Sequence, residues 1–345
     1  MGKLKKNISN VVKTLILPVG MFLFMFIITR FIGRGVFGTW ASTQPILRNT
    51  MLGSCIALAM SCNMLNGRWD FSVGMMVVLC PVLVIPLVDA WGLGTLGLLG
   101  LSIAAGVLLC MINAIAYIYI RVPSIVTSIG LMIAYESVIL VYNGGLGARI
   151  SDFEMLKLAM SPYIFIIGIV AMLLYYFLFT HSRFGYNVRS LAAGQLLAVN
   201  NGVNEKKNVI GCYVLSGVLI GIAGAIYVAM TGTLTATAKY NGSMYIMFEA
   251  FPPVFIGFYL MKYANLTIGV VLGSFTMKTL TAGMLALGIP AAMQNIGVGL
   301  FLMLFIAFTT NQERFREARD VRRRIALVTA SIEETRKAAI SEAEE

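Results

Sequence analysis

Between two apolar segments, residues 181–208 read HSRFGYNVRSLAAGQLLAVNNGVNEKKN, the longest polar interruption between segments suited to lipid. Its middle, residues 188–199, has the pattern of a short amphipathic helix, and Gly202 follows where such a helix would end. The loop carries four cations and one acid, namely Arg183, Arg189, Lys206, Lys207 and Glu205. A basic loop between membrane spans is typical of the cytoplasmic side. We therefore expect this loop to meet a soluble partner inside the cell.

The composition of the whole chain indicates a membrane protein. Of its 345 residues, 59% are hydrophobic and 12% are charged, whereas a soluble domain carries about 25% charged residues. The net charge of +11 does not indicate a nucleic-acid surface, because eight cations balance eight acids from residue 313 onward and the other cations lie mostly at the ends of apolar segments. We expect an all-α polytopic membrane protein that has no nucleic acid among its partners.

Ten apolar segments predict about ten transmembrane helices, since a helix needs about 20 residues to cross the hydrocarbon. The segments are 14–32, 46–65, 70–89, 92–120, 123–142, 161–180, 209–230, 244–260, 264–288 and 292–310. Segment 92–120 is long for one helix and predicts either a tilted span or two broken pieces, and segment 244–260 is short enough to cross incompletely. The basic N-terminus has no cleavage site after its apolar run, which predicts a retained first span that starts in the cytoplasm.

The distribution of cations agrees with ten spans and two cytoplasmic termini. Eleven cations before the tail then face the cytoplasm: Lys3, Lys5, Lys6, Lys13, Arg68, Arg121, Arg183, Arg189, Lys206, Lys207 and Lys262. Six face the outside: Arg30, Arg34, Arg48, Arg149, Lys157 and Lys239. The excess of cations inside favours this orientation, which places loop 181–208 in the cytoplasm.

No cluster of residues indicates catalysis or a metal site. The five cysteines lie in or beside apolar segments without a CxxC pair, and the one histidine, His181, has no triad or ligand partner nearby. The sequence GSFTMKT at 273–279 lacks the second glycine of a phosphate-binding loop and lies inside an apolar segment. We expect a chain that is not an enzyme, with no catalytic residue, no metal and no cofactor of its own.

Charged residues inside apolar segments are costly and need a reason. Asp70, in NGRWDFSVG, either caps the third span with its carboxylate at the positive end of the helix or belongs to a solute pathway. Glu136, Glu249 and Lys278 lie within spans, and either glutamate can neutralise the lysine. They form either structural pairs between helices or the relay of an ion-coupled carrier. The Pro-Pro pair that starts at Pro252 removes two backbone donors and predicts a kinked or broken span.

Glycine patterns and two outer loops carry further expectations. GxxxG pairs at 217–221 and 269–273, and glycines at every third residue over 94–100, predict close helix packing. Loop 143–161 begins with glycines and contains a short helical pattern, and loop 231–243 is rich in Thr, Ala and Gly. Each loop is either a simple connector or a docking surface for an external partner.

Three stretches together resemble one family, the permease subunits of ABC importers of the ribose or simple-sugar type, in the ribose/branched-chain amino acid superfamily. NGRWDFSVGMM at 66–76 is similar to the family's G-x-D-L-S-V-G signature, and LSGVLIGIAGAIYVA at 215–229 is similar to its glycine-rich span. RFGYNVRSLAAGQLLAVNNGVNEKK at 183–207 resembles its cytoplasmic loop, with an FG-x-x-x-R start, a glycine–polar pair and a G-[IV]-[NPD] end. The matching positions are Phe184, Gly185, Arg189, Gly194, Gln195, Gly202, Val203 and Asn204.

This resemblance implies a permease subunit of an ATP-driven, binding-protein-dependent importer in the bacterial cytoplasmic membrane. Loop 181–208 would then be a coupling loop that rests on a separate ATPase subunit, which holds ATP and Mg. Within the loop, Ala192, Ala193, Gly194 and Gln195 would seat closely on the ATPase, and the flanking cations would orient it. An extracytoplasmic solute-binding protein and a second permease copy, in a homodimer or a heterodimer, would complete the assembly.

The resemblance implies a monosaccharide or a similar small polar molecule as the solute, with nucleosides, signalling furanoses and branched-chain amino acids as alternatives. Candidates for the translocation pathway are Asn66, Asp70, Ser72, Asn113, Glu249 and Pro252. The chain departs from the family's GG-x-x-x-x-GG loop at AFPPVFIGFYLMKYAN, residues 250–265, where prolines and aromatic residues replace glycines. An alternative of another class is an ion-coupled secondary carrier that uses Glu136, Glu249 and Lys278.

The expected domain organisation is a transmembrane permease domain over residues 1–310 and a cytoplasmic tail over 311–345. Apolar residues recur every three or four positions in the tail, which predicts a helix. This tail either braces the ATPase, lies on the membrane surface or extends into solvent.

Overall fold

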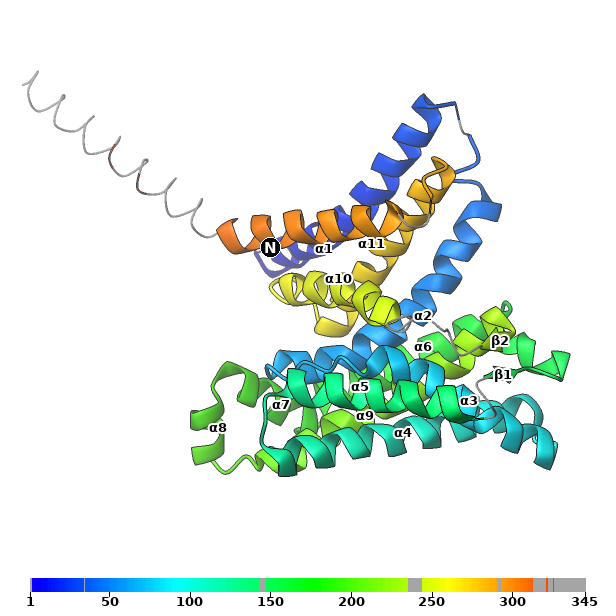
Figure 1. The fold of residues 1–345 in the computed structure, drawn as a ribbon. Helices are drawn as coiled ribbons and strands as arrows, with labels where there is room; N and C mark the ends of the chain where they lie inside the picture. Colours follow the sequence, from blue (N-terminus) through cyan, green and yellow to red (C-terminus); the bar gives the residue numbers. More distant parts are fainter. Residues whose placement is uncertain are drawn as a thin grey trace, which may run out of the picture. The chain divides into compact units, whose positions relative to one another are not determined.

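The computed structural model describes residues 2–33, 35–142, 147–234, 244–290 and 293–312, together with Val321 and Ile325. Its contacts divide the chain into two units, Met1–Gln294 and Asn295–Glu345. The first unit consists of helices and, among its described residues, one two-stranded sheet (Figure 1). The all-α fold class is therefore confirmed.

Each of the ten apolar segments forms a helix, and the predicted bounds agree closely with the observed ones except that the first helix begins well before residue 14. The helices of the first unit are α1 Gly2–Phe31, α2 Trp40–Leu65, α3 Val73–Trp91, α4 Gly94–Ile120, α5 Ser124–Val141, α6 Tyr163–His181, α7 Arg183–Ala193, α8 Gln195–Asn200, α9 Glu205–Thr231, α10 Met244–Leu260 and α11 Leu266–Ala286. The tenth apolar segment corresponds to the helix Met293–Gln312.

Eight described helices are long and apolar enough to cross a membrane, judged by length and composition alone. These are α1, α3, α4, α5, α6, α9, α11 and Met293–Gln312. Two of the predicted spans fall outside this set: α2 has 26 residues but is more polar, and α10 has only 17 residues. The segment expected at 92–120 is one unbroken helix of 27 residues, and its length of about 40 Å exceeds the hydrocarbon thickness and favours a tilt.

Helix α9 lies at the centre of the first unit, where it packs against α2, α3 and α4. At its crossing with α4 the two backbones touch. A Cβ added to Gly217 would lie 2.6 Å from the Cα of Val107, and one added to Gly221 would lie 2.3 Å from the carbonyl oxygen of Ser102. The predicted packing role of this glycine pair is confirmed, because any larger residue would push the helices apart.

The two other glycine patterns differ from each other. A Cβ added to Gly273 on α11 would lie 2.7 Å from the carbonyl oxygen of Pro253 on α10, so this pair also marks a close crossing. On α4, a Cβ added to Gly94 or Gly100 would meet nothing within 4 Å, and one added to Gly97 would lie 2.2 Å from the Cβ of Leu93, which belongs to the start of the same helix and not to a neighbouring one. The close packing expected over 94–100 is therefore wrong for the described residues, because α9 crosses α4 further along the helix.

Helix α10 continues through both prolines. It runs from Met244 to Leu260 with Pro252 and Pro253 inside it, so of the two predicted alternatives, a kinked span and a broken span, the break does not occur. Helix α11 packs closely against this turn, where a Cβ added to Gly273 would contact the backbone of Pro253. Pro252 itself is buried.

The two outer loops join each other at the end of the helices opposite α7 and α8 (Figure 1). Strand β1 (Ala148–Arg149) pairs antiparallel with β2 (Thr233–Leu234). The short helix expected in loop 143–161 is present as η2 (Phe153–Ala159). The sequence did not predict the strand pair, since strands of two residues are too short to show alternation.

The second unit is described over residues 295–312, which continue the helix Met293–Gln312. The helical tail predicted over 311–345 lies outside the described residues except for four positions. Of these, Asn311 and Gln312 end the helix, and Val321 and Ile325 are helical and exposed.

Candidate functional site

Loop 181–208 folds into two short helices rather than one. Helices α7 and α8 are separated by Gly194, which is the C-cap of the first and the N-cap of the second. Glycine is a poor helix former, which explains why the single helix predicted over 188–199 is interrupted here. After α8, Gly202 has a φ of 88°, a left-handed conformation that favours glycine, so the predicted helix stop is confirmed.

The FG-x-x-x-R start of the loop fixes α7 to the permease itself. A Cβ added to Gly185 would lie 1.9 Å from the carbonyl oxygen of Phe179, so only glycine fits against the end of α6. The ring of Phe184 covers Gly211 on α9, where an added Cβ would lie 2.7 Å from the ring. The guanidinium of Arg189 donates to the carbonyl oxygen of Phe179 at 2.5 Å and lies over its ring. These residues hold the start of the loop against the end of α6 and against α9.

The second half of the loop is exposed. Ala192, Ala193 and Gln195 are exposed, and Gly194 is partly so. The side chains beside them, Leu196 and Leu197, are 81% and 70% exposed. These two neighbouring leucines form a small exposed apolar surface on a loop that is otherwise mostly polar. The sequence interpretation named the small residues and missed the two leucines, because a leucine in a short helix is expected to face inward.

A polar contact links α8 to the start of α9 and to the α2–α3 connection. The side-chain amide of Gln195 donates to Oε1 of Glu205 at 2.9 Å. The same oxygen lies 3.7 Å from Nη2 of Arg68, whose side chain is 5% exposed. The guanidinium of Arg68 also lies 6.0 Å from the ring centre of Tyr117 on α4.

Three of the predicted pathway residues come together in a sealed polar cluster. The carboxylate of Asp70 accepts hydrogen bonds from the backbone N–H of Ser72 at 3.0 Å, from its hydroxyl at 2.6 Å and from Asn113 at 3.2 Å. Tyr135 on α5 donates to the side-chain oxygen of Asn113 at 2.8 Å. Asp70, Ser72 and Asn113 are at most 3% exposed. The cluster joins the start of α3 to α4 and α5.

The sequence left two roles open for Asp70, a cap at the start of α3 and a part of a solute pathway. Its carboxylate lies near the positive start of α3 and accepts the N–H of Ser72, the N-cap residue, but among the described residues no side chain caps an N–H of the helix itself. Asn66 lies at the other end of the same connection, with its amide donating to the carbonyl oxygen of Cys62 at 3.3 Å. Its side-chain oxygen is buried without a hydrogen-bond partner.

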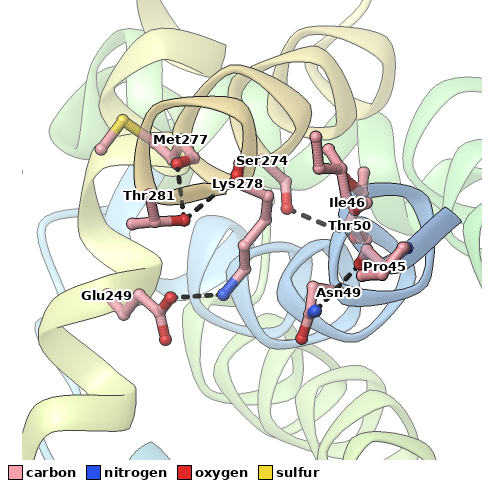
Figure 2. Close-up of polar contacts among 9 residues, drawn as sticks. All are labelled: Pro45, Ile46, Asn49, Thr50, Glu249, Ser274, Met277, Lys278 and Thr281. Carbon is pink, nitrogen blue, oxygen red and sulfur yellow. Dashed lines mark hydrogen bonds and ion pairs between the residues drawn. The ribbon is translucent and has the colours of Figure 1, made fainter. Parts of the chain in front are cut away.

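A second polar site lies between α10 and α11, where Glu249 forms an ion pair with Lys278. Figure 2 shows the two side chains pointing toward each other, with Thr50 of α2 nearby. The hydroxyl of Ser274 donates to the carbonyl oxygen of Thr50 at 3.3 Å. Gly53 leaves room for the lysine, since an added Cβ would lie 3.1 Å from its Cε. The sequence left the partner of the lysine open, and the structure assigns Glu249.

The ion pair faces a small cavity of about 80 Å³. Tyr227 of α9, Tyr245 of α10 and Ser274 of α11 add hydroxyl groups to its wall. Glu136, the other candidate, is buried on α5, which packs against α3 and α4 rather than forming part of this wall. The structure therefore brings together two of the three charges that the carrier hypothesis needs.

The chain is similar to known proteins over most of its length. A family model described as "Branched-chain amino acid transport system / permease component" matches residues 42–308. Relatives include proteins named "Autoinducer 2 import system permease protein LsrC" from Yersinia pseudotuberculosis serotype O:1b (strain IP 31758) and from Yersinia pestis (strain Pestoides F). Each is 24% identical over 289 residues, which cover 82% of this chain and 81% of the relative. No solved structure matches the chain.

Proposed function

Because the chain belongs to the family of branched-chain amino acid transport system permease components, we propose that it is driven by a separate ATPase subunit through its loop 181–208. The family confirms the resemblance on motifs: the chain is a permease subunit of a binding-protein-dependent ABC importer, a multi-pass protein of the bacterial inner membrane. A permease is a transporter component rather than an enzyme. The partners, the docking surfaces and the solute are the subject of the proposal.

The exposed tip of α8 carries this proposal. Leu196 and Leu197 offer an apolar contact, while Gly185 and Arg189 hold the base of the loop against α6. A rigid base and an exposed apolar tip are what a lever between two proteins needs, because a flexible loop would absorb the motion. The ATPase binds ATP and Mg, and the permease itself holds no cofactor. ATP-driven closure of the ATPase then moves α7 and α8 and, through them, the spans.

The proposed topology has ten spans with both termini in the cytoplasm. It counts α2 and α10 as spans beside the eight longer or more apolar helices, and it is supported by the excess of cations on the side of loop 181–208. The opposite end carries the strand pair β1–β2 and the 84% exposed ring of Phe153. There we place the contact with the solute-binding protein. A second permease copy, identical or similar, completes the pathway.

The solute is a monosaccharide or a similar small polar molecule. The relatives are named as permeases of autoinducer 2 import systems, which favours a signalling molecule of sugar size among the alternatives. Autoinducer 2 is therefore the first solute to test, followed by ribose. Nucleosides and branched-chain amino acids are further candidate solutes for an importer of the same architecture.

Co-purification with a candidate ABC ATPase subunit from the same organism tests the proposal. We expect the wild-type chain to retain the ATPase, and a Leu196→Glu/Leu197→Glu variant to lose it because two carboxylates replace the apolar contact. Phe153→Glu makes the same change at the opposite end and should retain the ATPase while weakening capture of the binding protein. Retention of the ATPase by the double variant would show that the tip of α8 is not the contact.

A further inference from the structure

The connection between α2 and α3, residues 66–72, touches more of the first unit than its length suggests. Its backbone closes α2, where the N–H of Arg68 donates to the carbonyl oxygen of Asn63 at 3.0 Å. The N–H of Trp69 donates to Ser124 at the start of α5 at 3.0 Å. Asp70 belongs to the sealed cluster with Asn113 of α4. The connection is thus fixed to three helices by hydrogen bonds.

Aromatic rings extend these contacts to α10. The ring centre of Trp69 lies 5.8 Å from that of Phe251 and 6.1 Å from that of Phe255. Phe71 lies 5.9 Å from Phe251 and 6.4 Å from Phe248. These α10 rings lie in and beside the stretch where the chain departs from its family's glycine-rich pattern. Their packing means that a displacement of residues 66–72 also displaces the helix that carries Glu249.

Arg68 is the one charged side chain of this connection that faces loop 181–208. It is 4% exposed, and its Nη1 atom is buried without a hydrogen-bond partner. Its Nη2 atom is 3.7 Å from Oε1 of Glu205, whereas a charge-assisted hydrogen bond is about 2.8 Å long. A buried guanidinium that is paired but not hydrogen-bonded to its carboxylate is under-satisfied, which is uncommon and calls for an explanation.

The carboxylate of Glu205 stands between this guanidinium and the tip of the loop. The oxygen that faces Arg68 also accepts the hydrogen bond from Gln195, the first residue of α8, at 2.9 Å. A movement of α8 that carries Gln195 therefore acts on the same atom that faces the guanidinium. Because Glu205 is 34% exposed at the first turn of α9, its side chain has room to move.

We propose that Arg68 is the positioning residue through which loop 181–208 controls the helices around residues 66–72. This inference rests on the proposed function, since the ATPase supplies the movement. In the structure, Oε1 of Glu205 accepts a hydrogen bond from Gln195 at 2.9 Å and lies 3.7 Å from Nη2 of Arg68, which is within ion-pair distance but too far for a hydrogen bond. When the ATPase displaces α8, Glu205 closes on Arg68, and the connection moves together with the sealed cluster on α4 and α5 and the aromatic rings on α10. The switch is the Glu205 carboxylate, which is hydrogen-bonded to Gln195 in one position and to Arg68 in the other.

The test uses the complex of permease and ATPase in liposomes, with the binding protein and autoinducer 2 as the solute. We expect Arg68→Met to lower ATP-dependent uptake by about tenfold or more, while ATP hydrolysis stays within about twofold of the wild type. Arg121→Met is the matched control, because it removes an exposed arginine at the nearby end of α4. It should leave both rates within about twofold.

A double variant separates positioning from simple charge balance. If Arg68 only neutralises Glu205, Arg68→Met/Glu205→Gln should restore uptake, because no unpaired charge is then left over. If Arg68 transmits movement, the double variant stays as impaired as the single one. Restored uptake would overturn the proposal. So would unchanged uptake in Arg68→Met, or a parallel loss of uptake, hydrolysis and retained ATPase, which would indicate a role in assembly.

The fluorescence of Trp69 gives a readout that a merely structural role would not move. In a variant that keeps Trp69 as its only tryptophan, through Trp40→Phe and Trp91→Phe, we expect ATP binding to the complex to shift the emission. The shift should disappear when Arg68→Met is added, and its persistence would contradict the proposal. If the wild-type chain captures no ATPase, the proposed function fails and this inference fails with it. Failure of the inference alone leaves wild-type uptake intact.

Discussion

Two polar sites inside the first unit carry charge in different ways. At the sealed cluster, Asp70 is 3% exposed and receives three hydrogen bonds from Ser72 and Asn113. At the ion pair, the side chains of Glu249 and Lys278 are 25% and 15% exposed and face a cavity. The sealed cluster surrounds its carboxylate with neutral hydrogen-bond donors and excludes solvent. The ion pair balances its carboxylate with a single opposite charge and lies beside a cavity.

The difference indicates which site is a joint between helices and which site is accessible. A carboxylate that is closed off from solvent needs several fixed donors, so the cluster of Asp70 fixes the relative positions of α3, α4 and α5. A partly exposed pair beside a cavity can be hydrated by water, so it tolerates change more easily once its charge is balanced.

The largest effect is expected from Lys278→Met. This change leaves the carboxylate of Glu249 without its partner, and we expect the free energy of unfolding in detergent to fall by about 3 kcal/mol. The double variant Lys278→Met/Glu249→Gln should recover most of the loss, because it removes both charges. A single variant as stable as the wild type would show that the cavity already hydrates the carboxylate fully.

Asp70→Asn should cost about 2 kcal/mol of unfolding free energy, because an amide turns one donor toward the amide of Asn113 and loses charge-assisted hydrogen bonds. The matched control is Asp89→Asn on the surface, where Asp89 accepts a hydrogen bond from Ser151 at 2.8 Å. There the change should stay within about 0.5 kcal/mol. Equal effects of both variants, measured in the same detergent, would mean that the cluster is not sealed.

The two sites can be compared by removing one tyrosine hydroxyl from each of them. Tyr135→Phe leaves the side-chain oxygen of Asn113 without its donor, so we expect a loss of about 1 kcal/mol. Tyr245→Phe removes a hydroxyl at the cavity, where the side chain is 48% exposed, and should cost much less. The melting temperatures of the two variants give the comparison, and a reversed order would contradict it.

The smallest effect is expected on transport. The double variant Lys278→Met/Glu249→Gln should retain ATP-dependent uptake within about twofold of the wild type, because an importer driven by a separate ATPase needs no titrating pair. An ion-coupled carrier that uses these charges would lose uptake in the same assay. Glu136→Gln is a second variant that removes a charge. It should retain uptake in an importer driven by an ATPase and lose uptake in an ion-coupled carrier.

Much of this architecture was predictable from the sequence because lipid imposes a strong and simple pattern on helices. The ten apolar segments each became a helix, and Asn113 lies against Asp70 and Ser72 although it is 43 and 41 positions away from them along the chain. Gly217 and Gly221 marked a close crossing because their spacing places both on one helix face.

Other features depended on contacts that no local pattern encodes. The choice of Glu249 over Glu136 for Lys278 follows from which helices pack together, and the exposure of Leu196 and Leu197 follows from the break at Gly194. The strand pair between the outer loops depends on two segments that are far apart in sequence. Pairings of this kind are set by the three-dimensional packing of the first unit rather than by the periodicity of any segment.

ATP-dependent uptake in liposomes tests the central claim most directly, that this permease is moved by an ATPase through loop 181–208. The permease, the ATPase and the binding protein are reconstituted together, and accumulation of labelled autoinducer 2 is measured with and without ATP. We predict uptake only when all three proteins and ATP are present, and its loss in Leu196→Glu/Leu197→Glu. Uptake by the permease alone, driven by an ion gradient in the absence of ATP, would contradict the account.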